Sequence, residues 1–150
     1  MAELKPILLA EDNPKDVELT LEALAENNLA NRVTVVNDGV EALAYLRCEG
    51  KYRTRRPGNP AVVVLDIKMP RMDGIDVLRA IRSDPTLKQI RVVMLTSSRE
   101  EHDLIRSYEL GSNAYVVKPV RFAEFVEAVK QLGIFWAIIN ELPPDRSIPS

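Results

Sequence analysis

Val62-Val63-Val64-Leu65-Asp66 is the stretch of sequence that decides the fold. Four large apolar residues stand in a row, and three of them are β-branched, which is typical of a strand covered on both faces. Pro70 and Gly74 follow, and such residues end a strand and turn the backbone. We therefore predict a central strand of a parallel sheet, with Asp66 at its carboxyl end.

The position of Asp66 is relevant to function because ligands of open α/β sheets bind beyond the carboxyl ends of the strands. An acid at such an end is placed for chemistry. Taken alone, however, Asp66 is better explained as the cap of a loop. The residues at the other strand ends must decide between these two interpretations.

The composition predicts one globular domain. The chain has 150 residues, of which 46% are hydrophobic and 28% charged, and its net charge of -2 gives no electrostatic case for nucleic-acid binding. The N-terminus lacks a basic region followed by an apolar run, and no apolar stretch approaches a membrane span. We expect a cytoplasmic protein with no membrane segment, no DNA-binding domain and no second output domain.

The single cysteine, Cys48, excludes an internal disulfide, and the single histidine leaves no cluster of soft metal ligands. A hard, oxygen-bound metal remains possible.

Four further apolar runs predict strands, and helical patterns separate them. The predicted strands cover residues 7–10, 33–36, 91–96 and 114–117. The predicted helices begin after Asn13, Asp38 (with Glu41 as a capping box), Asp73, Ser98 (with Glu101) and near Phe122, and end near Glu26, Arg47, Asp84, Gly111 and residue 141. Five strands alternating with five helices predict an α/β, doubly wound, flavodoxin-like fold with a five-stranded parallel sheet in the order 2-1-3-4-5.

Residues 47–60 contain five basic residues, two prolines and two glycines with little periodicity. We predict a long surface loop whose basic side chains, Lys51, Arg53, Arg55 and Arg56, are solvent-exposed.

Four strands end in functional groups, which the predicted topology brings to one edge of the sheet. They are Glu11 and Asp12, Asp66, Thr96 and Lys118. Carboxylates about 4 Å apart repel by roughly 4 kcal/mol at an effective dielectric near 20, so a divalent cation is expected among them. A few carboxylates with room for water and phosphate suit Mg²⁺ better than Ca²⁺.

Lys118 adds a positive charge at this edge, and Thr96 adds a hydroxyl donor. Together they could hold the oxygens of a phosphoryl group on Asp66, because a carboxylate is a nucleophile that forms aspartyl phosphate. The metal would neutralise charge on the transferred group.

These residues carry a resemblance to a known family. Glu11-Asp12, Asp66 with Met69-Pro70 and Asp73-Gly74, Thr96-Ser97, Tyr115 and Lys118-Pro119 resemble the receiver domain of two-component response regulators. The resemblance covers about residues 5 to 132. It also implies the 2-1-3-4-5 order, so that order does not rest on the pattern alone.

The resemblance implies a role for each matching position. Asp66 accepts a phosphoryl group from a histidine of a sensor kinase, Lys118 pairs with the phosphate, and the Lys118-Pro119 bond is cis. Glu11, Asp12 and Asp66, with the backbone carbonyl of Lys68, bind Mg²⁺. Thr96 and Tyr115 form the switch, whose hydroxyl moves onto the phosphate while the aromatic ring turns inward. Lys68 and Ser98 occupy positions that tune dephosphorylation.

The basic loop and the tail beyond Leu132 are similar to those of the small response regulators that pair with bacterial and cyanobacterial phytochromes, including the Phe-Trp and Leu-Pro-Pro of the tail. A phytochrome-type kinase is therefore the expected partner, and kinase docking is an alternative role for the loop. We divide the single domain into a core of about residues 5–132, a helical extension of about 133–142 and a tail of 143–150.

The extension carries apolar side chains all round the helix. If Trp136 and Ile139 point toward the domain, Ile134, Phe135 and Ile138 face outward and form a patch typical of an interface. We predict a two-fold homodimer through this surface, with an intramolecular fold-back as the alternative.

The alternative function is a Mg²⁺-dependent phosphohydrolase with an aspartyl-phosphate intermediate. Such enzymes usually need a second acid close to the nucleophile and an added cap. Here Lys68 stands two residues after Asp66, and no insertion is large enough for a cap. We therefore favour a receiver that is not an enzyme beyond self-phosphorylation and slow autodephosphorylation.

Overall fold

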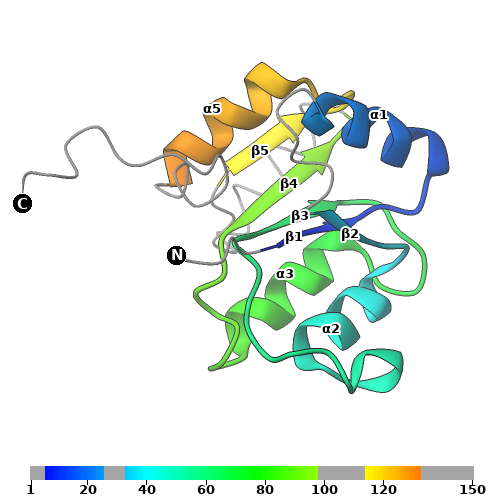
Figure 1. Cartoon of the computed structure of the whole chain (residues 1–150), viewed down its shortest axis with the longest axis vertical. Coiled ribbons are helices and arrows are strands. Elements are labelled where there is room, and N and C mark those ends of the chain that lie inside the picture. Colours follow the sequence, from blue (N-terminus) through cyan, green and yellow to red (C-terminus); the bar gives the residue numbers. More distant parts are fainter. Residues whose placement is uncertain (1–5, 26–32, 98–113, 133–150) are drawn as a thin grey trace, which may run out of the picture.

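The computed structural model describes residues 6–25, 33–97 and 114–132, which build a parallel sheet between two layers of helices (Figure 1). The five strands follow the order β2-β1-β3-β4-β5, and every neighbouring pair is parallel. The predicted fold and strand order are confirmed. The strands are β1 (Ile7–Ala10), β2 (Val33–Val36), β3 (Val62–Asp66), β4 (Val92–Thr96) and β5 (Ala114–Val117).

Strand β3 lies at the centre of the sheet, as its unbroken apolar sequence predicts. It pairs with β1 on one side and β4 on the other, and all five of its residues are buried. The edge strand β5 differs, because its residues alternate between buried and exposed positions. The predicted start of the fourth strand is one residue early, since β4 begins at Val92 and Arg91 is exposed.

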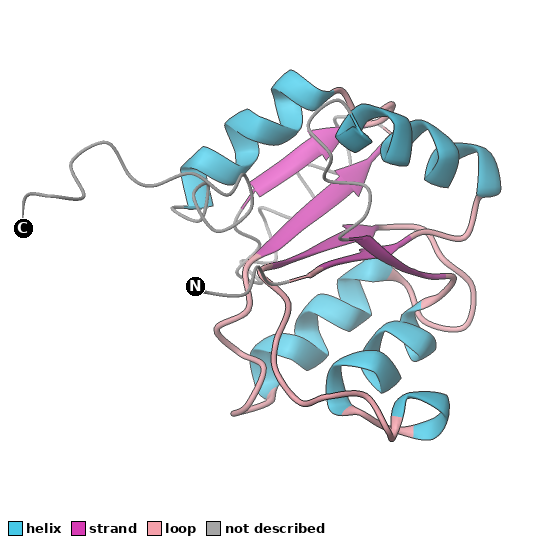
Figure 2. Cartoon of the chain, viewed as in Figure 1, coloured by secondary structure: helices cyan, strands magenta, loops and turns pink. Residues whose placement is uncertain are grey.

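Four helices belong to the described part of the chain. They are α1 (Pro14–Ala25), α2 (Gly39–Arg47), α3 (Gly74–Ser83) and α5 (Phe122–Leu132). Helices α1 and α5 cover one face of the sheet, and α2 and α3 cover the other (Figures 1 and 2). The helix predicted to begin after Ser98 lies outside the described residues, as does the extension beyond Leu132. None of the described helices is long and apolar enough to cross a membrane.

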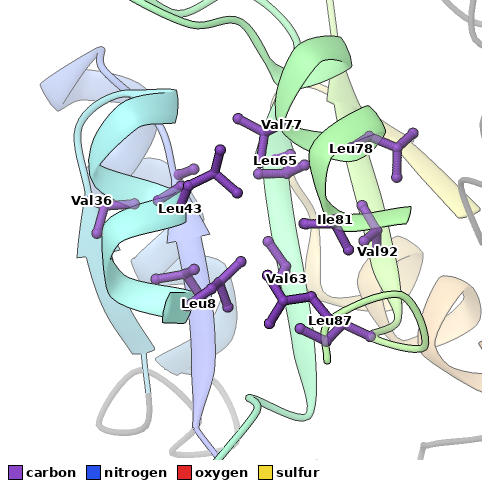
Figure 3. Packing of buried hydrophobic residues seen from close by; sticks show 14 of the residues in the cluster. Leu8, Val36, Leu43, Val63, Leu65, Val77, Leu78, Ile81, Leu87 and Val92 are labelled. Carbon is purple, nitrogen blue, oxygen red and sulfur yellow. The ribbon is translucent and has the colours of Figure 1, made fainter. Parts of the chain in front are cut away.

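Each face of the sheet carries its own hydrophobic cluster. Under α2 and α3, side chains such as Leu43, Leu78 and Ile81 pack onto Leu8 and Leu65 of the sheet (Figure 3). Under α1 and α5, the opposite faces of the same strands pack against Leu24, Phe125 and Ala128. This double covering is the reason that the central strands lack polar residues until their carboxyl ends.

The predicted helix caps are present at three helix starts. The Oδ1 of Asn13 accepts from the backbone N–H of Lys15 at 2.9 Å and from that of Asp16 at 3.2 Å, which fixes the start of α1. Asp38 caps α2 by accepting from the N–H of Glu41, and Asp73 caps α3 in the same way. The capping box predicted for α2 is only partly present. The Glu41 side chain accepts from the N–H of Asn37, one residue before the cap, instead of from the N–H of Asp38.

The basic loop is less solvated than its composition predicts. The chain forms a short 3₁₀ turn at Gly50–Tyr52, where the ring of Tyr52 packs against the α2–α3 core and its hydroxyl donates to Glu41 at 2.9 Å. The guanidinium of Arg55 lies over the ring of Tyr45 at 4.1 Å and donates through Nε to the Tyr45 carbonyl at 2.9 Å. Exposure is thus confirmed for Lys51, Arg53 and Arg56, whereas the prediction for Arg55 is wrong.

Candidate functional site

The carboxyl ends of the strands bring the predicted residues to one edge of the sheet. Glu11 and Asp12 follow β1, and Asp66 is the last residue of the adjacent β3. Thr96 ends β4 and Lys118 follows β5, which are the next two strands. The joint placement that the sequence predicts is therefore present.

Three carboxylates form a compact acidic cluster. Glu11, Asp12 and Asp66 each offer an oxygen, and these oxygens all lie within 4.8 Å of one another. Glu11 is fully buried and Asp66 is 4% exposed, whereas Asp12 is open to solvent. Hard carboxylate oxygens with one open side fit a cation such as Mg²⁺, which keeps several of its waters.

Local backbone contacts fix two of these acids. The N–H of Glu11 donates to the carbonyl of Val36 at 3.0 Å, and its Oε2 accepts from the N–H of Asn13 at 3.2 Å. The backbone of Asp66 lies against the start of α3, because a Cβ on Gly74 would meet the backbone carbonyl oxygen of Asp66. Only glycine therefore allows α3 to begin so close to the end of β3.

Lys118 is the cation of the site. Its Nζ lies 3.2 Å from Asp66 Oδ1, 3.4 Å from Glu11 Oε1 and 3.0 Å from Asp16 Oδ2. Its backbone N–H donates to the carbonyl of Thr96 at 2.8 Å, and its bond to Pro119 is cis. The ammonium is thus placed directly beside the carboxylate of Asp66.

Burial and like charge shift the protonation of the cluster. Burial, reinforced by the hydrogen bond and the charge of Asp66, raises the pKa of Glu11 to about 7. Burial also raises the pKa of Asp66, with a smaller contribution from the charge of Asp12, although the ammonium of Lys118 opposes this. For Lys118, burial alone would lower the pKa, but Asp16, Asp66 and Glu11 raise it well above its usual range. The site therefore combines a permanent cation with carboxylates that favour a further positive charge.

Thr96 and Tyr115 lie on neighbouring strands with opposite exposure. Thr96 is fully buried at the end of β4, whereas Tyr115 on β5 is 42% exposed. The side chain of Lys68 is exposed two residues beyond Asp66. Ser98 and the predicted interface residues Ile134, Phe135 and Ile138 lie outside the described residues.

Two contacts at this edge were not predicted from the sequence. Asp16 of α1 pairs with Lys118, a residue 102 positions later in the chain. Arg71 adopts φ 65° in the loop after β3, and its Nη2 lies 2.8 Å from Oδ2 of Asp38, the cap of α2. The only sequence signal for Asp16 is its position about one helical turn after Glu11 and Asp12. No sequence signal points to the contact between Arg71 and Asp38, because only the fold brings these two residues together.

Comparisons with known proteins agree with this geometry. Residues 7–130 match the family model of the response regulator receiver domain. The chain is 36% identical over 139 residues to response regulator Rcp1 of Synechocystis sp., covering 93% of each protein.

The solved structures that resemble this chain are also response regulators. The bacteriophytochrome response regulator AtBRR is 58% identical, with a TM-score of 0.87 over 93% of this chain and 100% of that one. The bacteriophytochrome response regulator RtBRR is 57% identical, with a TM-score of 0.86 over 97% of this chain and 87% of that one. The Mn²⁺-bound form of Rcp1 is 36% identical, with a TM-score of 0.70 over 93% and 99% of the two chains.

The acidic cluster and the adjacent lysine lie on a five-stranded sheet within the matched residues 7–130. The family match favours a signalling protein over the phosphohydrolase alternative. The chain therefore belongs to the receiver domain family of two-component response regulators.

Proposed function

We propose that this chain is a phosphorylation-controlled signalling module in which Asp66 accepts a phosphoryl group from a histidine of a sensor kinase. The observation that carries this proposal is the setting of Asp66. Asp66 is 4% exposed as a residue, its carboxylate stands 3.2 Å from the ammonium of Lys118, and it shares the edge of the sheet with Glu11 and Asp12. An aspartate so placed is suited to form an acyl phosphate.

The transfer proceeds by displacement at phosphorus. A carboxylate oxygen of Asp66 forms the new O–P bond, the N–P bond of the phosphohistidine breaks, and its electron pair returns to the imidazole nitrogen. Lys118 donates a charge-assisted hydrogen bond to an oxygen of the transferred group. Thr96, at the end of the neighbouring strand, supplies a hydroxyl to a second oxygen.

The acidic cluster supports Mg²⁺ as the cofactor of this step. Glu11, Asp12 and Asp66 would hold it with the backbone carbonyl of Lys68, in the way that oxygen ligands hold this ion in other sites. When bound, Mg²⁺ supplies charge neutralisation on the transferred phosphoryl group. The relative Rcp1 has been solved in a Mn²⁺-bound form, which supports the proposal that this chain also binds a divalent cation.

Thr96 and Tyr115 are proposed as the switch. Thr96 is buried, and its carbonyl accepts from the N–H of Lys118, so a change at Asp66 acts on both β4 and β5. Tyr115 is 42% exposed, so in this state its ring is not packed inside the domain. Phosphorylation then favours one of two conformations, and that bias is the signal.

The names of the relatives support a phytochrome-type histidine kinase as the phosphoryl donor, because AtBRR and RtBRR are bacteriophytochrome response regulators. We propose that the chain works in the cytoplasm as a receiver domain.

We further propose a homodimer through α5 and the chain that follows it, since the sequence predicts an outward-facing apolar patch of Ile134, Phe135 and Ile138.

The test is phosphotransfer from a panel of sensor kinases encoded in the same genome, with phytochrome-type kinases included. The expected result is rapid Mg²⁺-dependent transfer from one kinase to the unmutated chain and none to Asp66→Asn. A matched control is Asp76→Asn, which neutralises an exposed aspartate of α3 outside the acidic cluster. Equal transfer to Asp66→Asn would show that another residue is the acceptor.

A further inference from the structure

Lys118 is bonded to one carboxylate that the phosphorylation chemistry does not use. Of its three acidic partners, Asp16 is the nearest at 3.0 Å, ahead of Asp66 at 3.2 Å and Glu11 at 3.4 Å. Asp16 does not belong to the group of acids close enough to share a cation, which within the described residues comprises Glu11, Asp12 and Asp66. Its interaction is therefore directed to the lysine.

The backbone of Asp16 is fixed at the point where α1 begins. Its N–H donates to Oδ1 of Asn13, and α1 starts at Pro14, whose ring presets the helical backbone. The Asp16 side chain is 28% exposed, against 17% for Lys118, so the ion pair is partly shielded from water. A rigid helix start thus presents a carboxylate to the end of a flexible side chain.

We propose that Asp16 is a positioning residue, which holds the ammonium of Lys118 beside Asp66 so that it meets the incoming phosphoryl oxygen. This inference rests on the proposed function of Asp66. A lysine side chain is long and flexible, and ordering it before the reaction removes an entropy cost from the transfer step.

Asp16 is suited to this task because its partnership with Lys118 does not change during the reaction. Glu11 and Asp66 would hold Mg²⁺, and Asp66 would also carry the phosphoryl group, so their contacts with Lys118 must weaken or move. An ammonium has three N–H donors, so one can remain on Asp16 while another reaches the phosphoryl oxygen. Helix α1 thereby anchors the phosphate-pairing lysine that follows β5 in every state of the site.

The experiment compares Asp16→Ala and Asp16→Asn with the unmutated chain. Asparagine keeps an acceptor oxygen but removes the charge, so it separates orientation from electrostatics. The control is Asp76→Ala, which also removes an acid from the first turn of a helix, α3, but one that pairs with Arg79 instead. Circular dichroism and thermal unfolding verify that each variant is folded.

Two readouts are measured for each variant. The first is the rate of Mg²⁺-dependent labelling by acetyl phosphate, which reports the chemistry without a docked kinase. The second is the NMR signal of the Lys118 ammonium in the metal-free protein, assigned through Lys118→Arg, which reports the contacts of the ammonium separately from the chemistry.

We expect labelling to slow by about tenfold in Asp16→Ala and by a smaller factor in Asp16→Asn, with Asp76→Ala unchanged. The Lys118 signal should shift or broaden in the same order. Labelling of Asp16→Ala at an unchanged or faster rate would overturn the inference, as would an unchanged Lys118 signal. If the unmutated chain itself takes no label on Asp66, the proposed function fails instead, and the two failures are thereby distinguished.

Discussion

At the scale of single residues, Glu11 bears the main electrostatic cost of the site. Glu11 is fully buried beside the carboxylate of Asp66. Burial, together with the hydrogen bond and the charge of Asp66, raises the pKa of Glu11 from 4.5 to about 7. The folded state therefore binds a proton on Glu11 more tightly than the unfolded chain does. In the metal-free protein, ionisation of Glu11 therefore opposes folding, and a bound divalent cation would offset this cost.

The sign of this effect predicts a pH dependence. Between pH 4.5 and about 7 the folded state holds more protons than the unfolded chain, so the free energy of unfolding falls as the pH rises. The shift corresponds to roughly 3 kcal/mol. Denaturant unfolding of the metal-free protein from about pH 5 to about pH 8 should show this loss, and Mg²⁺ should restore stability at the higher pH.

Glu11→Gln should flatten the pH profile. The control is Glu41→Gln: burial tends to raise the pKa of Glu41, but Lys51, Asn37 and Tyr52 together lower it, so its contribution changes below pH 4.5. A Glu11→Gln profile as steep as that of the unmutated protein would contradict the account.

Site residues were predictable where a strand end placed them. Glu11, Asp12, Asp66 and Lys118 each follow an apolar run, so the topology alone brings them together. The role of Asp16 was not predictable, since its contact with Lys118 depends on the angle at which α1 leaves the sheet. Local pattern does not encode that angle.

At the scale of elements, the end of β3 packs closely against the start of α3. A Cβ on Gly74 would overlap the carbonyl oxygen of Asp66 and lie 3.0 Å from Cα of Ile67. Backbone cannot move aside as a side chain can. Gly74→Ala should therefore separate α3 from β3.

We expect Gly74→Ala to lose about 2 kcal/mol of stability and to label more slowly, because Asp66 moves with its carbonyl. Chemical denaturation and acetyl-phosphate labelling measure the two effects. Gly50→Ala is the control, since its φ of 58° adds strain of about 1 kcal/mol but its Cβ meets nothing within 4 Å. The prediction is wrong if both variants label at the same rate.

The elements themselves followed from the sequence to different degrees. Strand β3 and the caps Asn13 and Asp73 were predicted correctly, because an apolar run and a side-chain cap are local signals. The basic loop was predicted only in part: Lys51, Arg53 and Arg56 are exposed as predicted, whereas Arg55 packs on Tyr45 of α2. The composition of a loop shows its charge but does not show that a ring such as that of Tyr45 packs against one of its basic side chains.

At the scale of the whole molecule, the alternation of strands and helices was sufficient to predict the layers and the edge that carries the site. The strand order drew on the family resemblance as well as on the pattern. Oligomeric state stays a prediction, because residues 133–150 lie outside the described part of the chain.

Sedimentation of the intact chain beside Phe135→Glu tests the predicted homodimer. A charge at the centre of an apolar interface should weaken association at least about tenfold, since buried aromatic residues dominate binding energy. Monomers of both proteins across micromolar concentrations, with and without phosphorylation, would rule the dimer out.

The central claim is that Asp66 is the phosphorylation site, and peptide mapping after Mg²⁺-dependent labelling with acetyl phosphate tests it most directly. The account predicts one phosphoryl group per chain, located on Asp66, not formed when the metal is chelated before labelling and absent from Asp66→Asn. Undiminished labelling of Asp66→Asn, or a phosphoryl group mapped to another residue of the unmutated chain, would contradict it.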